Sequence, residues 1–151
     1  MPRSCALRAT TASAGYNPLM TAAEREVLQA NAAFYAAFTQ RDAEAMDALW
    51  AREVPVACLH PGWEPLSGRE EVVSSWRRIL LGGGAPPDIR CEDASVHVSG
   101  EVAWVVCAEI VPGGSLAATN VFVRERGAWR MAHHHASPLP RPAPRPAGFR
   151  S

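Results

Sequence analysis

Residues 89–137 decide the fold, and they read IRCEDASVHVSGEVAWVVCAEIVPGGSLAATNVFVRERGAWRMAHHHAS. Apolar runs rich in β-branched and aromatic residues fill most of this stretch, as is typical of strands. The long runs are residues 89–98, 102–111, 116–124 and 128–137. The connections between them are short and contain glycine, at residues 99–100, 112–114 and 125–127. Consecutive strands joined by such turns pair antiparallel, so the stretch predicts a four-stranded antiparallel meander.

A helix is predicted well ahead of the meander, beginning at Thr21. Thr21 and Glu24 have the spacing of a capping box, in which the hydroxyl accepts from a backbone amide and the carboxylate reaches back. Mostly apolar positions then recur at helical spacing, and they are Val27, Asn31, Phe34 and Phe38. Residues three or four apart lie on one face of a helix, so we expect this face to pack on the sheet.

Two more helices are predicted before the meander. Asp42 is placed to cap a short second helix. Ser67 and Glu70 have the spacing of another capping box and predict a third helix, which glycines 82–84 end. The apolar stripe of this third helix is Val72, Val73, Trp76, Ile79 and Leu80. A short strand is expected at residues 54–60, between the second and third helices.

Helices followed by a meander indicate an α+β fold. We expect a curved antiparallel sheet, made of the meander and the short first strand, wrapped by three N-terminal helices. Both faces of this sheet are apolar, because Trp104 and Val106 alternate with Val105 and Cys107 along one strand. The helices cover one face, and we expect the other face to bind a second copy of the chain as a homodimer.

Composition excludes several classes of function. The 151 residues are 48% hydrophobic, which suits a globular domain. No apolar run reaches the roughly 18 residues of a membrane helix. Acidic and basic residues balance at 15 each, so no net field attracts nucleic acid or an anionic membrane. All basic residues are arginine, which excludes Schiff-base chemistry. No nucleotide-binding glycine pattern is present, so chemistry without a cofactor fits best.

The cysteines have spacings that match no zinc or dithiol motif, and they are Cys5, Cys58, Cys91 and Cys107. Three of them lie in apolar runs, where a free thiol behaves as a small hydrophobe. We therefore expect reduced thiols and a cytoplasmic protein. Residues 1–20 lack periodicity and are expected to be flexible. Residues 140–151 are rich in Pro and Arg and are expected to form a disordered tail. Residues 21–139 are left as the folded domain.

Several short motifs carry a family resemblance through their order and spacing. They are Phe34-Tyr35, Asp42, His60-Pro61-Gly62-Trp63, Gly68-Arg69-Glu70 with Trp76, and the ending GAWRMAHHHAS at residues 127–137. Together they make residues 30–138 resemble the nuclear-transport-factor-2-like superfamily, and within it the SnoaL-like domains. The resemblance implies a cone-shaped domain with a central pocket for a small molecule. It implies no single activity, because the superfamily includes ketosteroid isomerases, polyketide cyclases, dehydratases, epoxide hydrolases and the non-catalytic association domain of calcium/calmodulin-dependent kinase II.

The resemblance to ketosteroid isomerase suggests two catalytic candidates. That family has its carboxylate base just before a proline at the end of the first strand, where this chain has His60 before Pro61. Its oxyanion-hole aspartic acid corresponds to Asn120, and its oxyanion-hole tyrosine to Phe34, with Tyr35 about 100° round the helix. The resemblance thus implies His60 as a general base that titrates near neutrality and Asn120 as a donor to an oxyanion. A purely structural hydrogen bond from His60 to a backbone carbonyl is the alternative.

The other expected pocket residues are mainly aromatic, which suits a flat apolar ligand. The expected ligand-binding residues are Asn31, Phe34, Tyr35, Phe38, Trp50, Trp63, Trp76, Trp104, Val106 and His134. Four of the five tryptophans belong to this set, and we expect them to form a wall of the pocket. A satisfied core amide is the alternative interpretation of Asn31.

The triple histidine has two interpretations. Alternation along a strand places His133 and His135 on the face of Trp129 and Met131, and the middle histidine on the opposite face, which by resemblance looks into the pocket. A His-x-His pair on a strand can chelate zinc, and Glu109 is the plausible local third ligand. Packing or hydrogen bonding at an interface is the alternative, and we expect no metal.

Three functions remain open from the sequence. The first is a small-molecule-binding domain of unproven catalysis that takes an apolar or aromatic ligand. The second is a cofactor-independent isomerase, cyclase or dehydratase with His60 as general base. The third is a non-catalytic dimerisation or association domain. The loss of the recognisable catalytic carboxylates favours the non-catalytic functions, and the polar groups kept at pocket positions favour chemistry.

Overall fold

The computed structural model describes residues 19–85 and 87–140. The helices in this part are α1 (Ala22–Thr39), α2 (Ala43–Leu49) and α3 (Arg69–Leu81). Two short strands lie between α2 and α3, and they are β1 (Ala57–Leu59) and β2 (Leu66–Ser67). The long strands are β3 (Arg90–Ser99), β4 (Val102–Val111), β5 (Gly114–Glu125) and β6 (Ala128–Pro138). The expected flexible segment and tail lie outside the described residues, apart from residues 19, 20 and 140.

The predicted starts of the first two helices are confirmed. Thr21 Oγ1 accepts from the Glu24 amide at 3.1 Å, and Glu24 Oε2 accepts from the Thr21 amide at 2.8 Å, which completes a capping box on α1. Asp42 Oδ1 accepts from the Ala45 amide at 2.9 Å and caps α2. These bonds satisfy amides that the first turn of a helix leaves without partners.

The start of α3 differs from the prediction. Ser67 and Glu70 do not form a capping box, because the cap residue is Gly68, which has a φ of 90° and makes no side-chain cap bond. Ser67 instead belongs to β2, and its amide donates to Glu71 Oε2 at 3.2 Å. Glycine reaches this positive φ without the steric cost that a side chain would add. The glycine therefore turns the chain directly from β2 into α3.

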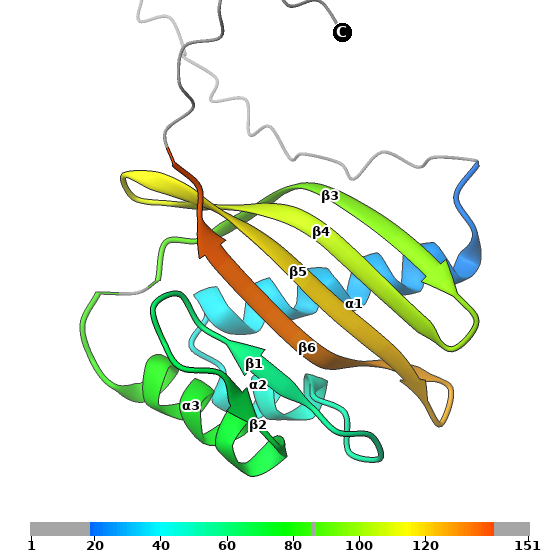
Figure 1. The fold of residues 1–151 in the computed structure, drawn as a ribbon, viewed down its shortest axis with the longest axis horizontal. Helices are drawn as coiled ribbons and strands as arrows, with labels where there is room; N and C mark the ends of the chain where they lie inside the picture. The colour runs from blue at the N-terminus through cyan, green and yellow to red at the C-terminus, as the bar shows by residue number, and fades with distance from the viewer. Residues whose placement is uncertain (1–18, 86, 141–151) are drawn as a thin grey trace, which may run out of the picture.

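The sheet has the strand order β2-β1-β6-β5-β4-β3, and Figure 1 shows it as a curved layer with α1 lying across one face. Strands β3 to β6 pair antiparallel and form the predicted meander. The predicted short strand is present as β1, and it runs parallel to β6. The sequence patterns missed β2, which pairs antiparallel with β1. The α+β class is confirmed, with one more strand than predicted and one parallel pair.

A β-bulge in β6 reverses the side-chain alternation just before the histidines. The pairing shifts between Val121 and Phe122 of β5, because β6 carries one extra residue, Ala132. Trp129 and Met131 are consequently buried on the inner face, at 7% and 0% exposure, together with the middle histidine. The prediction that they share the face of the outer histidines is therefore wrong, since strict alternation does not hold across a bulge.

A second irregularity lies in the edge strand β3. Its pairing with β4 shifts between Glu92 and Ser95. Asp93, inside this interval, has a φ of 53°, which is uncommon for a residue other than glycine. Cys91 before the shift and Val96 after it are both half-buried, although strict alternation would place them on opposite faces. The bulge lets both halves of β3 present side chains to the interior.

The core lies between the helices and the inner face of the sheet. Val27 and Phe34 of α1 and Val72 and Trp76 of α3 are each at most 1% exposed. Phe34 packs edge-on against Trp76, with 5.3 Å between ring centroids. Burying a large apolar side chain stabilises a fold by about 1.5–3 kcal/mol, so these helix faces hold the layers together. In the described part of the chain, no helix has the length and hydropathy needed to cross a membrane.

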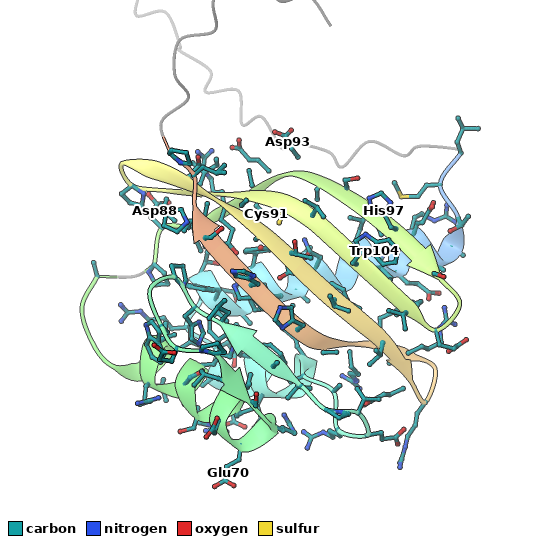
Figure 2. The ribbon with its side chains drawn as sticks, in the orientation of Figure 1. Glu70, Asp88, Cys91, Asp93, His97 and Trp104 are labelled. Carbon is teal, nitrogen blue, oxygen red and sulfur yellow. The ribbon has the colours of Figure 1, made fainter. Side chains whose placement is uncertain are left out.

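The outer face of the meander carries an apolar strip on β4. Val102, Trp104 and Val106 are exposed at 42%, 37% and 43%. Figure 2 shows Trp104 beside His97 of β3, and the two rings stack with 5.3 Å between centroids. Trp104 and Val106 do not line the interior as predicted, because the inner positions of β4 are the alternate residues. The prediction of two apolar sheet faces agrees with this strip.

Candidate functional site

An open groove lies between α1 and the start of β3, with a volume of about 650 Å³. Leu28, Ala32 and Ala36 line its α1 side, and Cys91 and Ala94 line its β3 side. The β3 bulge contributes Ala94 to this wall, so the irregularity in the strand shapes the opening. The groove is mainly apolar, as small-molecule sites commonly are.

Two polar residues of α1 line the same groove. Asn31 and Tyr35 are four residues apart and project from one side of the helix. They are only 3% and 6% exposed, so their polar atoms lie at the base of the groove. Tyr35 Oη donates to Glu109 Oε1 at 2.8 Å, and Asn31 Oδ1 accepts from Asn120 Nδ2 at 2.8 Å. The groove therefore leads into polar groups within the apolar interior.

These groups belong to one hydrogen-bonded network, which we call the buried polar cluster, made of Asn31, Tyr35, Glu109, Asn120 and His134. Asn120 Nδ2 also donates to Tyr35 Oη at 3.2 Å, and Asn120 Oδ1 contacts His134 Nδ1 at 2.6 Å. His134 Nε2 lies 3.8 Å from Glu109 Oε1, which closes the ring of contacts. The cluster draws one residue or more from α1, β4, β5 and β6.

The hydrogen bonds determine which nitrogen of His134 carries the proton. Asn120 uses its amide nitrogen to donate to Asn31, so its oxygen faces His134 and can only accept. His134 Nδ1 must therefore donate, which leaves Nε2 with its lone pair directed toward Glu109. A protonated Glu109 would be able to donate a hydrogen bond to this lone pair. Tyr35 donates to Oε1 of the same carboxyl group, the oxygen that lies 3.8 Å from His134 Nε2.

Burial sets the charge states in the cluster. It lowers the pKa of His134 to about 3, so this imidazole is neutral at pH 7. Burial raises the pKa of Glu109, against the hydrogen bond from Tyr35, which lowers it. The pKa of Tyr35 is also raised, first by burial and then by the Glu109 charge, so its hydroxyl stays protonated. The cluster thus holds a neutral imidazole, a carboxyl group whose burial favours its protonated form, and a hydroxyl donor.

Side chains fill the middle of the cone, where the sequence placed the pocket. Phe34, Trp76, Asn120 and His134 are at most 2% exposed. Phe34 and His134 contact each other with 5.0 Å between ring centroids. Phe38 packs on Trp76 at 5.0 Å and closes this layer. Phe34, Phe38 and Trp76 therefore form a packed aromatic core beside the cluster, and the groove lies at the edge of the cone.

His60 lies apart from the groove. Its Nε2 is 2.9 Å from Ser75 Oγ, and its ring packs between Trp63 and Trp76, each with 4.8 Å between centroids. Burial, and then the Arg78 charge, lower its pKa to about 4. The predicted base that titrates near neutrality is therefore a neutral imidazole bonded to a serine. Trp76 contacts both His60 and His134, but His60 and Asn120 do not meet as one catalytic pair.

The tryptophans do not form one wall. Trp50 is fully buried in an isolated bridge to Met131 of β6. Trp63 is 41% exposed in the turn after β1, under the guanidinium of Arg78 at 5.5 Å from the ring centre. Trp104 is on the outer sheet face. The predicted aromatic wall is wrong because the four rings lie on different layers of the fold, and only Trp76 contacts the cluster.

The outer histidines, His133 and His135, lack the third ligand that the sequence suggested for them. His133 Nδ1 lies 3.0 Å from the Ala57 carbonyl oxygen, and its ring is 6.3 Å from that of His135. Glu109 cannot be a third ligand, since it is buried on the opposite face of the sheet. Among residues 19–85 and 87–140, no group of three or more His, Cys, Asp or Glu side chains is arranged to hold a metal ion.

The sequence patterns did not identify Glu109 as a member of the buried polar cluster. It was considered only as a metal ligand, yet it is 2% exposed and accepts from Tyr35. The alternation of β4 could have indicated that this carboxylate is buried. The apolar inner positions of the strand are Ala103, Val105 and Cys107, and Glu109 is the next position in that series. Charged residues are rarely buried unless they are paired. A carboxylate at an inner position of a strand is therefore a candidate functional residue.

Sequence comparison supports the same fold family. The SnoaL-like domain family matches residues 27–142. The F-box protein SKIP8 of Arabidopsis thaliana is 31% identical over 118 residues, which are 77% of this chain and 51% of that protein. The chain therefore spans about half the length of this curated relative.

Solved structures show the same architecture. A candidate dehydratase of the nuclear-transport-factor-2-like family from Streptomyces avermitilis is 35% identical, with a TM-score of 0.72 over 79% of this chain and 97% of that one. A candidate calcium/calmodulin-dependent protein kinase type II association domain from Thiobacillus denitrificans is 36% identical, with a TM-score of 0.66 over 74% and 93%. Since the family match extends over well more than half of its residues, the chain belongs to the SnoaL-like domain family.

Proposed function

We propose that this SnoaL-like domain binds a small, uncharged and mainly apolar molecule in the groove between α1 and β3, with one polar group of the ligand at Asn31 and Tyr35. The observation that carries the proposal is the continuity of an apolar groove with the buried polar cluster at its base. A volume of about 650 Å³ lies within the usual range of small-molecule sites.

Asn31 is the group best placed to receive a ligand. Within residues 19–85 and 87–140, its Nδ2 donates only to Cys91 Sγ, at 3.5 Å, and a thiol is a weak acceptor. A carbonyl or hydroxyl oxygen arriving in the groove would be a better partner for this amide. The other side of Asn31 is fixed by Asn120, so the donor is held in place before the ligand binds.

The charges around the groove favour a neutral ligand. Arg90 and Glu92 line the β3 side and pair with each other at 3.4 Å, so the charges on this side balance. Within the cluster, His134 is neutral, and burial favours the uncharged form of Glu109. A charged ligand would lose its water without gaining an opposite charge, which is costly.

The cluster also contains the groups needed for proton transfer. Tyr35 can donate to an oxygen that gains charge, and Glu109, with its raised pKa, can exchange a proton near the groove. The similarity to a candidate dehydratase is consistent with a cofactor-independent lyase or isomerase activity of this kind. In this version of the proposal Glu109 takes the general-base role that was expected of His60.

The test uses two adjacent alanines on α1. Ala32 lines the groove, whereas Ala33 is exposed and is not part of the lining. A library of neutral carbonyl compounds is screened by thermal shift, and its hits are measured again on Ala32→Trp and Ala33→Trp. We expect Ala32→Trp to abolish binding and Ala33→Trp to leave it unchanged. Equal affinity in all three proteins would refute the groove as the binding site.

A second function, association, is supported by the apolar strip on the outer face. Val102, Trp104 and Val106 are exposed together on one strand, which a free monomer rarely shows. A similar solved structure is a candidate association domain. We propose that this face binds a second copy. Sedimentation should give a dimer that Trp104→Ser disrupts, whereas Trp63→Ser, at a similarly exposed tryptophan, should leave it intact; a monomeric wild-type protein would refute this.

A further inference from the structure

Two cysteines lie close to each other on neighbouring strands. Cys91 of β3 pairs in register with Glu109 of β4, and Cys107 is the next position of β4 on the inner face. The two side chains are therefore diagonal neighbours on adjacent strands. Cys91 is half-buried and lines the groove, whereas Cys107 is 5% exposed beneath it. One sulfur of the pair is thus open to small molecules and the other is sheltered.

The backbone around the pair can adjust. A disulfide needs its Cβ atoms about 3.5–4.5 Å apart. Diagonal neighbours in an antiparallel pair start somewhat farther apart, at Cα separations of about 7–8 Å, so the strands must close slightly. β3 is the edge of the sheet and is paired on one side only. The bulge between Glu92 and Ser95 follows Cys91 directly, and a bulge has an unpaired residue that can take up a shift.

The neighbours of the pair keep the sulfurs in place. Asn31 Nδ2 donates to Cys91 Sγ at 3.5 Å, and Tyr35 Oη lies 3.3 Å from Cys107 Sγ. The interaction with Cys91 lowers the pKa of Cys107 against the effect of burial, whereas the same interaction and burial raise the pKa of Cys91. A hydrogen-bonded sulfur with a lowered pKa is the better attacking group in disulfide formation.

Cys58 provides the contrast within the same molecule. It is 1% exposed, and its sulfur lies 3.8 Å from His60 Nε2. Burial raises its pKa to about 12, so it remains a thiol at neutral pH. It is on β1, separated from β4 by β6 and β5 in the strand order. Position therefore distinguishes the Cys91–Cys107 pair from the other described cysteine.

We propose that Cys91 and Cys107 form a dithiol modification site that a small peroxide oxidises to an intramolecular disulfide. The sulfur of Cys91, which faces the groove, attacks one peroxide oxygen, the O–O bond breaks, and the departing hydroxide takes up the thiol proton as water. The sulfenic acid on Cys91 is then attacked by the Cys107 thiolate. The S–S bond forms, the S–O bond breaks, and a second water leaves. Two thiols lose two electrons in total, and hydrogen peroxide is reduced to two waters.

The experiment exploits the positions of the cleavage sites. Cys91 and Cys107 lie in one tryptic peptide, residues 91–124, and Glu101 lies between them, so a glutamate-specific protease separates the two cysteines. Full-length protein is treated with about one equivalent of hydrogen peroxide, unreacted thiols are alkylated in denaturant, and the digest is analysed by mass spectrometry. No ligand is needed, so the outcome is independent of whether the groove binds one.

We expect the alkylated thiols to fall from the four of the reduced chain to two, with the Cys91 and Cys107 peptides linked and the link released by dithiothreitol. Cys107→Ser should lose the linked peptide, and Cys58→Ser should keep it. Should the serine variant fail to fold, the linked peptide in the wild-type protein still decides the question. Peroxide-treated protein in which Cys91 is only sulfinylated, or is linked to Cys5 or Cys58, would overturn the proposal.

Discussion

Replacing His60 with glutamine tests whether the interior holds this imidazole in its neutral form. His60 is 4% exposed, bonded to Ser75 and enclosed by two tryptophan rings. Burial lowers its pKa from 6.5 to about 4. Glutamine keeps a polar group of similar length that can bond Ser75, but it does not titrate.

The sign and size of the effect follow from the two pKa values. Between pH 6.5 and about 4 the unfolded chain binds a proton at position 60 that the folded chain does not bind, so the free energy of unfolding falls as the pH falls. A difference of about 2.5 between the pKa values corresponds to about 3 kcal/mol. The fall in the free energy of unfolding begins below pH 6.5 and ends near the folded pKa. Its slope reaches about 1.4 kcal/mol per pH unit in the middle of the interval.

His134 adds a loss of the same sign, because burial lowers its pKa to about 3. The raised pKa of Glu109 acts in the opposite sense, so the test is the difference between the two slopes. Near pH 5 the wild-type protein should lose about 1.2 kcal/mol per pH unit more than His60→Gln. Urea unfolding at several pH values, at one protein concentration, measures both slopes. His97→Gln is the matched control, since His97 is exposed on the outer face. A His60→Gln protein that folds and keeps the wild-type slope would refute the assignment of His60 as a buried neutral base.

Two further predictions concern buried carboxylates. Tyr35→Phe removes the hydroxyl that donates to Glu109 and accepts from Asn120, and it should lower the free energy of unfolding by about 1–3 kcal/mol in urea titration; an unchanged stability would contradict the role given to this hydroxyl. Glu125→Gln weakens the bonds that the carboxylate accepts from the amides of Arg52, Glu53 and Val54 and should cost about 1.5–3 kcal/mol at pH 7. Desolvation alone would raise the pKa of Glu125, but these backbone bonds lower it overall, so the wild-type free energy of unfolding falls as the pH drops from 4.5 through the folded pKa. The contribution of Glu125 to that fall should vanish in the variant. A difference in stability between the two proteins that persists below the folded pKa would count against the account.

Much of the fold follows from short-range patterns in the sequence. The strand β4 has the bounds predicted from its apolar run, and the capping residues Thr21 and Asp42 lie at the starts of α1 and α2. These features depend on residues close together in the chain, and their physics is local. The parallel pairing of β1 with β6 is not local, because it joins residues more than 70 positions apart, such as Ala57 and His133.

The bulges explain why the face assignments in β6 failed. A strand alternates strictly only while its pairing is regular, and one extra residue such as Ala132 exchanges the faces of all residues beyond it. Nothing in the sequence around Ala132 marks this position. The same reason applies to β3, where Cys91 and Val96 both contribute to the interior across a shift in pairing.

The candidate site was predicted in part. Asn31, Tyr35, Asn120 and His134 were expected in a pocket, and the structure brings them together in one hydrogen-bonded cluster. His60 was expected to act beside Asn120, but a tryptophan separates it from the cluster. That separation depends on how α3 packs against the sheet, which residue spacing alone does not determine. The sequence also predicted a pocket at the centre of the cone, whereas the groove lies at its edge. This difference, too, depends on how side chains pack inside the fold.

The most direct test of the account is to observe Asn31 while a ligand binds. Asn31 and Asn120 have side-chain amide groups that give separate signals in ¹H–¹⁵N spectra, and both lie at the base of the groove or just beneath it. Titration with the neutral carbonyl compounds that raise the thermal stability should shift the Asn31 amide signal most, with Cys91 and Ala94 of β3 following. Compounds that bind and shift only outer-face residues such as Trp104 and Val106, while the Asn31 amide stays unchanged, would contradict a binding site in the α1–β3 groove.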